Sequence, residues 1–248
     1  MSAQGSAGKP CLAPRALLSI PGIVDGGHQM TKGRIEAFSD GVMAIIITIM
    51  VLELKVPHGH DLDALLPLWP VFLSYVLSFL YVGIYWNNHH HMFQAVRNIG
   101  GWVLWANLHL LFWLSLLPFT TGFMGENNFA AEPMALYAFN LLMCGIAYML
   151  LVFALIGQHG RDSTFAHALG TDVKGKVSVA LYILSIIASA VFGLPMLGFA
   201  LLTIVAVMWV CQTGALSRRR AKSRLRPGDR ARPTGLRRHG IAARSASP

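Results

Sequence analysis

Six long apolar segments follow one another along the chain, separated by short polar or charged stretches. Each comes close to the roughly 20 residues that an α-helix needs to cross a hydrocarbon core about 30 Å thick. The segments do not alternate with the period of two expected of β-barrel strands, so helices must satisfy their backbone polar groups. The predicted spans are Arg34–Leu54, Ala64–Trp86, Gly101–Phe123, Pro133–Gly157, Val177–Leu194 and Pro195–Leu216.

This pattern predicts an all-α, polytopic membrane protein with six transmembrane helices. Composition agrees, since the 248 residues are 54% hydrophobic and 12% charged, with a mean hydropathy of +0.53. That is more apolar surface than the core of a soluble domain of this length requires. We expect a disordered extension over residues 1–30, a transmembrane domain over 31–216 and a basic, disordered tail over 217–248. Met30 is an alternative start to Met1.

The basic residues predict the orientation, because Lys and Arg are retained on the cytoplasmic side during insertion. With the N-terminus inside, all but Lys55 of the 20 basic residues fall in cytoplasmic segments. Both termini are therefore expected in the cytoplasm, with the protein in the cell (inner) membrane. The outer loops and outer helix ends are net acidic and would concentrate cations. Their carboxylates are Glu53, Asp61, Asp63, Glu126 and Glu132.

The net charge of +9 comes largely from the Arg-rich tail after Ser217. A basic segment next to a membrane span favours attraction to anionic lipid headgroups, so we expect membrane lipids and no nucleic acid as partners. The three cysteines are far apart in sequence and predict neither a disulfide framework nor a zinc site.

The first span carries ionisable residues at membrane depth. Only the uncharged stretch 41–52 separates Asp40 from Glu53, which is too short to cross the hydrocarbon core. Ser39 and Asp40 must therefore lie within the membrane or at its edge, where such groups are expected to be paired or to line water.

A helical wheel divides this span into two stripes. One stripe is mostly apolar and contains Arg34, Phe38, Gly41, Ile45, Thr48 and Leu52. The other contains Glu36, Asp40, Met43, Ile47 and Val51. The spacing leaves two interpretations open. Either the apolar stripe lines a central axis in a symmetric oligomer, or it packs or faces lipid while Thr48 bonds its own backbone.

Three motifs resemble those of the transmembrane protein 175 family of potassium channels. Residues 34–41 read RIEAFSDG and match its R-x-x-x-F-S-D-G signature, with VMAIIIT continuing to Thr48. The run YWNNHHHMF over 85–93 is similar to the W-x-x-H element of the second helix. WANL over 105–108 and SLLPFT over 115–120 are similar to its third-helix element.

The resemblance implies a potassium-selective channel whose first helix lines the pore. The family lacks the TVGYG filter of ordinary potassium channels, and no such run occurs here. Positions matching the family's hydrophobic constriction and pore lining are Ile45, Thr48, Ile49 and Leu52. Those assigned by resemblance to a supporting hydrogen-bond network are Arg34, Phe38, Ser39, Asp40, Trp86, His89 and Asn107. The helical wheel instead puts Arg34 on the pore stripe.

The signature occurs once, whereas animal family members carry two six-helix repeats. One pore-lining helix cannot enclose a pathway, so the resemblance implies a homotetramer with potassium ions as the permeant species. A secondary transporter that uses Asp40 as a proton or cation site is the alternative. No complete catalytic constellation is present, so we expect no enzyme. His89, His90 and His91 have no second ligand cluster nearby in sequence, so no metal or cofactor is expected.

Overall fold

The computed structural model describes residues 32–96, 99–159 and 173–224, and every regular element within these ranges is a helix. The predicted all-α class is confirmed. The elements are α1 Lys32–Leu52, the 3₁₀ helix η1 Leu62–Leu68, α2 Trp69–Gln94, α3 Gly101–Ser115, α4 Leu117–Glu126, α5 Ala131–His159, α7 Val173–Ala190 and α8 Pro195–Arg224. The predicted extension over 1–30, including Met30, and the tail beyond Arg224 lie outside the described residues.

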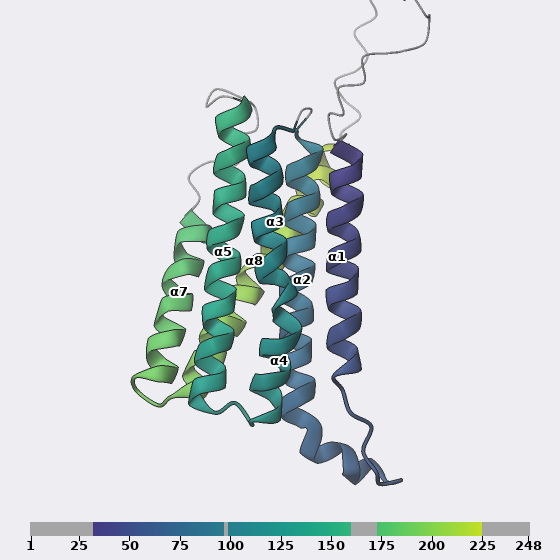
Figure 1. Cartoon of the computed structure of the whole chain (residues 1–248), viewed down its shortest axis with the longest axis vertical. Helices are drawn as coiled ribbons and strands as arrows, with labels where there is room; N and C mark the ends of the chain where they lie inside the picture. Colours follow the sequence, from purple (N-terminus) through teal and green to yellow (C-terminus); the bar gives the residue numbers. More distant parts are fainter. Residues whose placement is uncertain (1–31, 97–98, 160–172, 225–248) are drawn as a thin grey trace, which may run out of the picture.

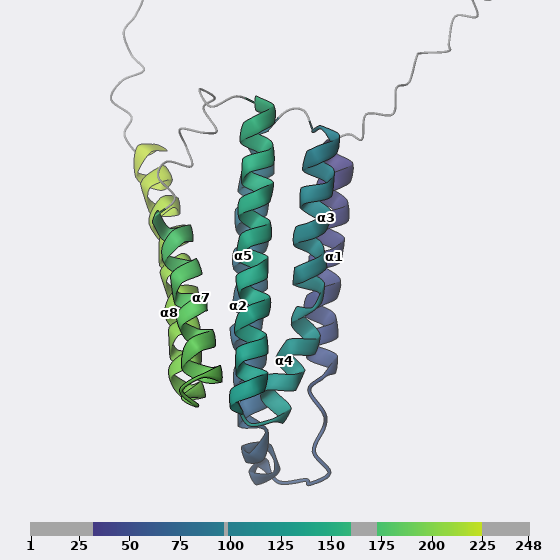
Figure 2. The same cartoon turned by 60° about the vertical axis from the view of Figure 1, so that its left-hand side comes forward.

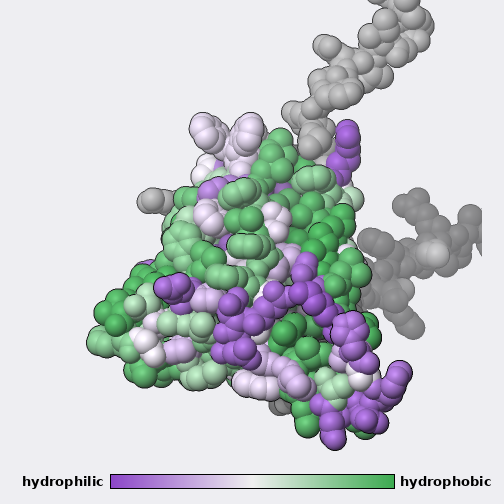
Figure 3. All heavy atoms as spheres, turned by 60° about the horizontal axis from the view of Figure 1, so that its bottom comes forward, coloured by the Kyte–Doolittle hydropathy of each residue, from purple (hydrophilic) through white to green (hydrophobic). Residues whose placement is uncertain are grey.

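Five helical segments of the described chain are long and apolar enough to cross a membrane. They are Lys32–Leu52, Leu62–Gln94, Gly101–Glu126, Ala131–Gln158 and Val173–Ala190. The apolar part of α8, Pro195–Cys211, is shorter. At the end of the molecule that holds η1, hydrophilic residues gather between apolar sides (Figure 3).

The helices run side by side along the long axis of the molecule (Figure 1). Helix α5 is central, since it packs against α3 and α4 and also against α7 and α8. Its buried face includes Leu141, Cys144 and Leu151, all inaccessible to solvent. Figure 2 shows α7 and α8 as a pair on one side of α5, with α3 and α1 on the other. Helix α1 contacts α2, α3 and α4, and so lies at one edge of the bundle.

The predicted third span is not one continuous helix but breaks between α3 and α4. Pro118 has no N–H to continue the helical ladder. The Leu116 N–H turns to the Trp113 carbonyl at 3.3 Å, and the Thr120 hydroxyl lies 3.3 Å from the Leu116 and Leu117 carbonyls. A hydroxyl of this kind satisfies carbonyls that a break would leave bare in the membrane.

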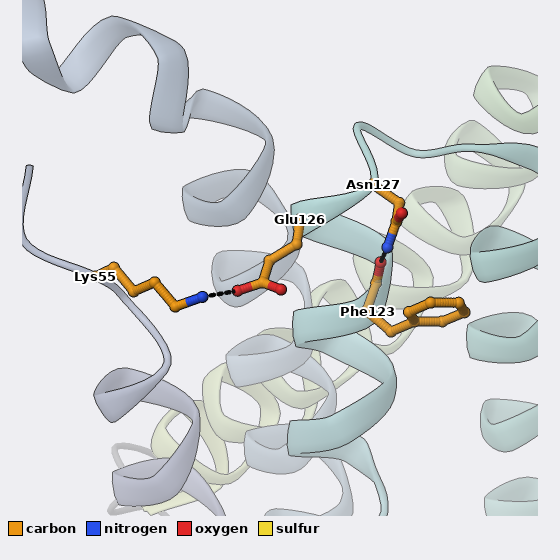
Figure 4. Close-up of polar contacts among 4 residues, drawn as sticks. All are labelled: Lys55, Phe123, Glu126 and Asn127. Atoms are coloured by element: carbon orange, nitrogen blue, oxygen red, sulfur yellow. Dashed lines mark hydrogen bonds and ion pairs between the residues drawn. The ribbon is translucent and has the colours of Figure 1, made fainter.

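Helix α4 is fixed on α2 by a close approach at its last turn. A Cβ added to Gly125 would lie 2.5 Å from the Ser74 hydroxyl and 2.9 Å from the Val71 Cα. The absence of a side chain at Gly125 therefore lets the two backbones meet. The adjacent Asn127 Nδ2 donates to the Phe123 carbonyl at 2.8 Å and closes the same turn (Figure 4). The last turn of α4 is therefore fixed in position against α2.

Several helix ends differ from the predicted ones. Helix α2 continues eight residues beyond Trp86, to Gln94, and carries the three histidines within it. Helix α8 runs through the basic residues after Ser217 to Arg224, so the first part of the predicted disordered tail is helical. Apolar length marks only the part of a helix inside the hydrocarbon core. Good helix formers continue α8 beyond it, whereas the end of α2 is rich in Asn and His and continues where His89, Met92 and Phe93 are buried in the bundle.

Candidate pore-lining helix and its supporting network

Helix α1 buries one face and leaves the other bare. The buried positions recur every three or four residues, which is one side of a helix. They are Ile35, Ser39, Met43, Ile46 and Met50. On the opposite side Ile45, Ile49 and Leu52 are 57%, 42% and 79% exposed. Within the part of the chain that the structure describes, the exposed ridge, meaning Ile45, Thr48, Ile49 and Leu52, is therefore left largely uncovered.

Thr48 lies in the middle of this ridge. Its hydroxyl donates to the Ile45 carbonyl at 2.8 Å, which is the local bond that one of the two sequence interpretations predicted. The bond occupies the hydroxyl proton and leaves the oxygen lone pairs as acceptors. An exposed oxygen in that state is suited to contact a cation.

A buried chain of hydrogen bonds holds the opposite face of α1. Asn107 on α3 donates through Nδ2 to the Ser39 hydroxyl at 3.0 Å. His89 on α2 donates through Nε2 to Asn107 Oδ1 at 2.8 Å. All three side chains are 2% exposed or less, so water does not compete for these bonds. These two hydrogen bonds join α1, α2 and α3 at the height of Ser39.

A second contact ties α1 to α2 at the edge of this network. The Trp86 indole N–H donates to the Asp40 carboxylate at 3.0 Å. The Trp86 ring stacks on His90, with centroids 5.7 Å apart and planes 13° apart. His90 in turn contacts Gln94 through Nε2 at 2.9 Å. The Asp40 carboxylate thus accepts a hydrogen bond from a neighbouring helix.

Arg34 and Phe38 are not brought into this network. Both are exposed in the single chain, and Arg34 has no hydrogen bond or ion pair within the described ranges. The geometry follows the helical wheel, which puts both residues on the ridge side of α1. At the same end, Lys32 and Glu36 approach to 3.9 Å, one turn apart.

The three histidines do not converge on one point, although the rings of His90 and His91 have centroids 5.8 Å apart. His89 points into the bundle and stacks on Phe93 at 4.3 Å, whereas His90 faces Trp86 and Gln94. Over the described part of the chain, no group of three or more His, Cys, Asp and Glu side chains is arranged to hold a metal ion.

Sequence reasoning missed a contact at the far end of α1. Lys55, just beyond the helix, makes an ion pair with Glu126 at the end of α4 (Figure 4). The two residues are 71 positions apart, and no local pattern relates them. Glu53 lies beside them in a groove between α1 and α4.

Comparison with known proteins shows which family has this first helix and its hydrogen-bond network. The family model of the endosomal/lysosomal potassium channel TMEM175 matches residues 34–118, which contain the ridge and the whole network. A protein named as a potassium channel from Chryseobacterium sp. is 51% identical over 181 residues, covering 73% of this chain and 93% of that protein. The chain belongs to the TMEM175 family.

Structure and more distant sequences agree with membership of this family. A crystal structure described as a lysosomal potassium-selective channel TMEM175 homolog from Chamaesiphon minutus has a TM-score of 0.61 and 29% identity, covering 73% of this chain and 97% of that one. The human endosomal/lysosomal proton channel TMEM175 is 31% identical over 140 residues, which is 52% of this chain and 27% of that protein. TMEM175 is a family of multi-pass ion channels and not of enzymes.

Proposed function

We propose that this chain is a potassium channel of the inner membrane, in which the α1 ridges of four copies surround one pore. The observation that carries the proposal is the asymmetry of α1. Two interhelical hydrogen bonds, one of them backed by the His89–Asn107 bond, and a buried apolar face fix one side, while Ile45, Ile49 and Leu52 remain exposed. Helix α1 is held in place, yet the described part of one chain leaves its apolar ridge largely uncovered. Such a ridge is suited to face the central axis of an assembly of several copies.

Copies of the chain are required because one ridge encloses no pathway. A rotational assembly turns the same face of each subunit toward its axis. Four copies are proposed because the chain has one signature sequence, and because the alignment to the longer human relative covers only 27% of that protein. In this arrangement α8 is the sixth span and both termini lie in the cytoplasm.

Ion passage is proposed to be controlled by the apolar side chains on either side of Thr48. Rings of Ile45 and Leu52 form a narrow neck that excludes water when closed, and widening the neck lets water and ions enter. Each Thr48 oxygen, with its proton bonded to Ile45, then replaces part of the hydration shell of the ion. Potassium is the proposed ion because two relatives that this chain covers over more than nine-tenths of their length carry that ion in their descriptions, at 93% and 97% coverage.

Flux from proteoliposomes tests this function. Purified protein is expected to have the mass of four chains and to pass potassium down its gradient without a proton gradient. Replacing Thr48 with alanine is expected to lower the potassium-to-sodium permeability ratio several-fold, because the exposed hydroxyl oxygen is removed.

Thr203→Ala is the matched control, since its hydroxyl also bonds a carbonyl of its own helix, Phe199 at 2.9 Å, but lies on α8. The control is expected to leave the ratio unchanged. A monomeric mass, saturable flux coupled to protons, or an unchanged ratio in Thr48→Ala would contradict the proposed pore.

A further inference from the structure

The outer end of α1 opens onto a groove that separates it from α4. The groove has a volume of about 430 Å³. Ile49 and Glu53 line it from the α1 side, and Phe119, Gly122 and Glu126 line it from α4. A space this large holds water, since one water molecule needs only about 10–15 Å³ measured in this way. Charged groups in the groove therefore act through water on ions near the ridge.

The Glu53 carboxylate lies inside this groove. A Cβ added to Gly122 would stand 3.9 Å from Glu53 Oε2, so the carboxylate lies over the bare backbone of α4. Glu53 has no ion pair or hydrogen bond within the part of the chain that the structure describes. It directly follows Leu52, the most exposed residue of the ridge.

The neighbouring cation does not pair with Glu53. The Lys55 ammonium donates to Glu126 Oε1 (Figure 4), and this hydrogen bond is the main cause that raises the pKa of Lys55 above its ordinary value. The charge of Glu126 and, more weakly, that of Glu53 act in the same direction. Lys55 therefore stays charged throughout the physiological pH range.

The position of Glu126 determines where the Lys55 charge lies. Glu126 is the last residue of α4, next to Gly125, whose backbone packs against α2. Exposed ion pairs contribute little to stability, so the pair is not a strong clamp on α1. Its consequence is electrostatic, because the positive charge is held at α4 and offsets Glu126. Among the described residues, Glu53 is thus left as a carboxylate beside the ridge without a paired cation.

We propose that Glu53 sets the rate at which potassium enters the pore from the outer side, and that Glu126 prevents Lys55 from cancelling its charge. This inference rests on the proposed function. Carboxylates at a pore mouth raise the local concentration of cations. The effect depends on ionic strength, because the screening length falls from about 30 Å at 0.01 M to about 3 Å at 1 M.

Inward potassium conductance across a planar bilayer, measured at outer potassium concentrations of about 10 mM and 1 M, tests the proposal. Glu53→Gln is expected to lower conductance several-fold at the low concentration and to match the native protein at the high one. Glu132→Gln removes an outer carboxylate on α5, outside this groove, and is expected to change neither value.

Two double variants separate the position of Glu53 from total charge. Lys55→Gln with Glu126→Gln keeps Glu53, whereas Glu53→Gln with Lys55→Gln keeps Glu126, and both have the native net charge. The first is expected to conduct like the native protein at 10 mM and the second to fall below it. Equal conductance of the two, or a native value for Glu53→Gln at low concentration, would overturn the inference. Absence of potassium current in the native protein at 1 M would instead refute the proposed function on which the inference rests.

Discussion

Replacing Asn107 with leucine is expected to destabilise the folded chain more than other single changes in its polar network. Asn107 donates to Ser39 and accepts from His89, so its loss leaves two buried polar groups without partners. An interhelical hydrogen bond in a membrane protein contributes about 0.6 kcal/mol on average, up to about 1.7. Leaving a buried group unsatisfied costs about 1–3 kcal/mol, so we expect a total of about 2 kcal/mol or more.

Thermal unfolding of the detergent-solubilised protein measures this effect. The midpoint is expected to fall, and the α1 position is expected to loosen enough to reduce potassium flux. Asn127→Leu is the matched control, because among the described residues that side chain bonds the adjoining helix α4, at the Phe123 carbonyl, and no other helix. A native midpoint for Asn107→Leu would show that the buried chain of hydrogen bonds does not hold α1.

Replacing Ile45 with asparagine is expected to raise potassium flux at least about tenfold, because a polar ring prevents the neck from drying. A tenfold change needs only about 1.4 kcal/mol from the barrier. Ile45 is 57% exposed in the single chain, so the substitution strains no intrasubunit packing. Proteoliposome flux at a fixed potassium gradient measures the change.

Ile45→Val keeps the position apolar and is expected to conduct like the native protein. Flux from Ile45→Asn that equals the native value, in protein that is folded and fully assembled, would mean that Ile45 does not face the pathway.

The sequence predicts part of how α1 is oriented, because one face of the helix is exposed and the other is buried against neighbouring helices. Helical spacing put Ile45, Thr48 and Leu52 on one stripe and Asp40 on another, whereas Ile49 came from the family resemblance. The second stripe is only partly the buried face, since its Val51 is 44% exposed. The wheel put Arg34 on the same stripe as Ile45, and the residue is exposed in the single chain, whereas resemblance to the family suggested a network role. Which residues pair with Ser39 and Asp40 came from the family motifs, since partners on other helices leave no local pattern.

Other features of the fold could not be predicted from the lengths of the apolar segments. Pro118 lies inside a span that remains apolar on both sides, so hydropathy does not reveal the break between α3 and α4. Both the extension of α2 to Gln94 and that of α8 to Arg224 begin in polar sequence, which a hydropathy pattern does not report. Helical propensity favours the extension of α8, whereas that of α2 coincides with the burial of His89, Met92 and Phe93. The Lys55–Glu126 pair depends on the tertiary approach of α1 and α4.

Modification of a cysteine at position 52 tests the shared α1 axis most directly. Leu52 is 79% exposed at the outer end of the ridge, whereas Ile183 is an exposed residue on α7, away from α1. In a background with the three native cysteines replaced, a water-soluble, positively charged thiol reagent is added from the outer side. We expect potassium flux to be blocked in Leu52→Cys and unchanged in Ile183→Cys. Undiminished flux through fully modified Leu52→Cys would contradict the α1-lined pore.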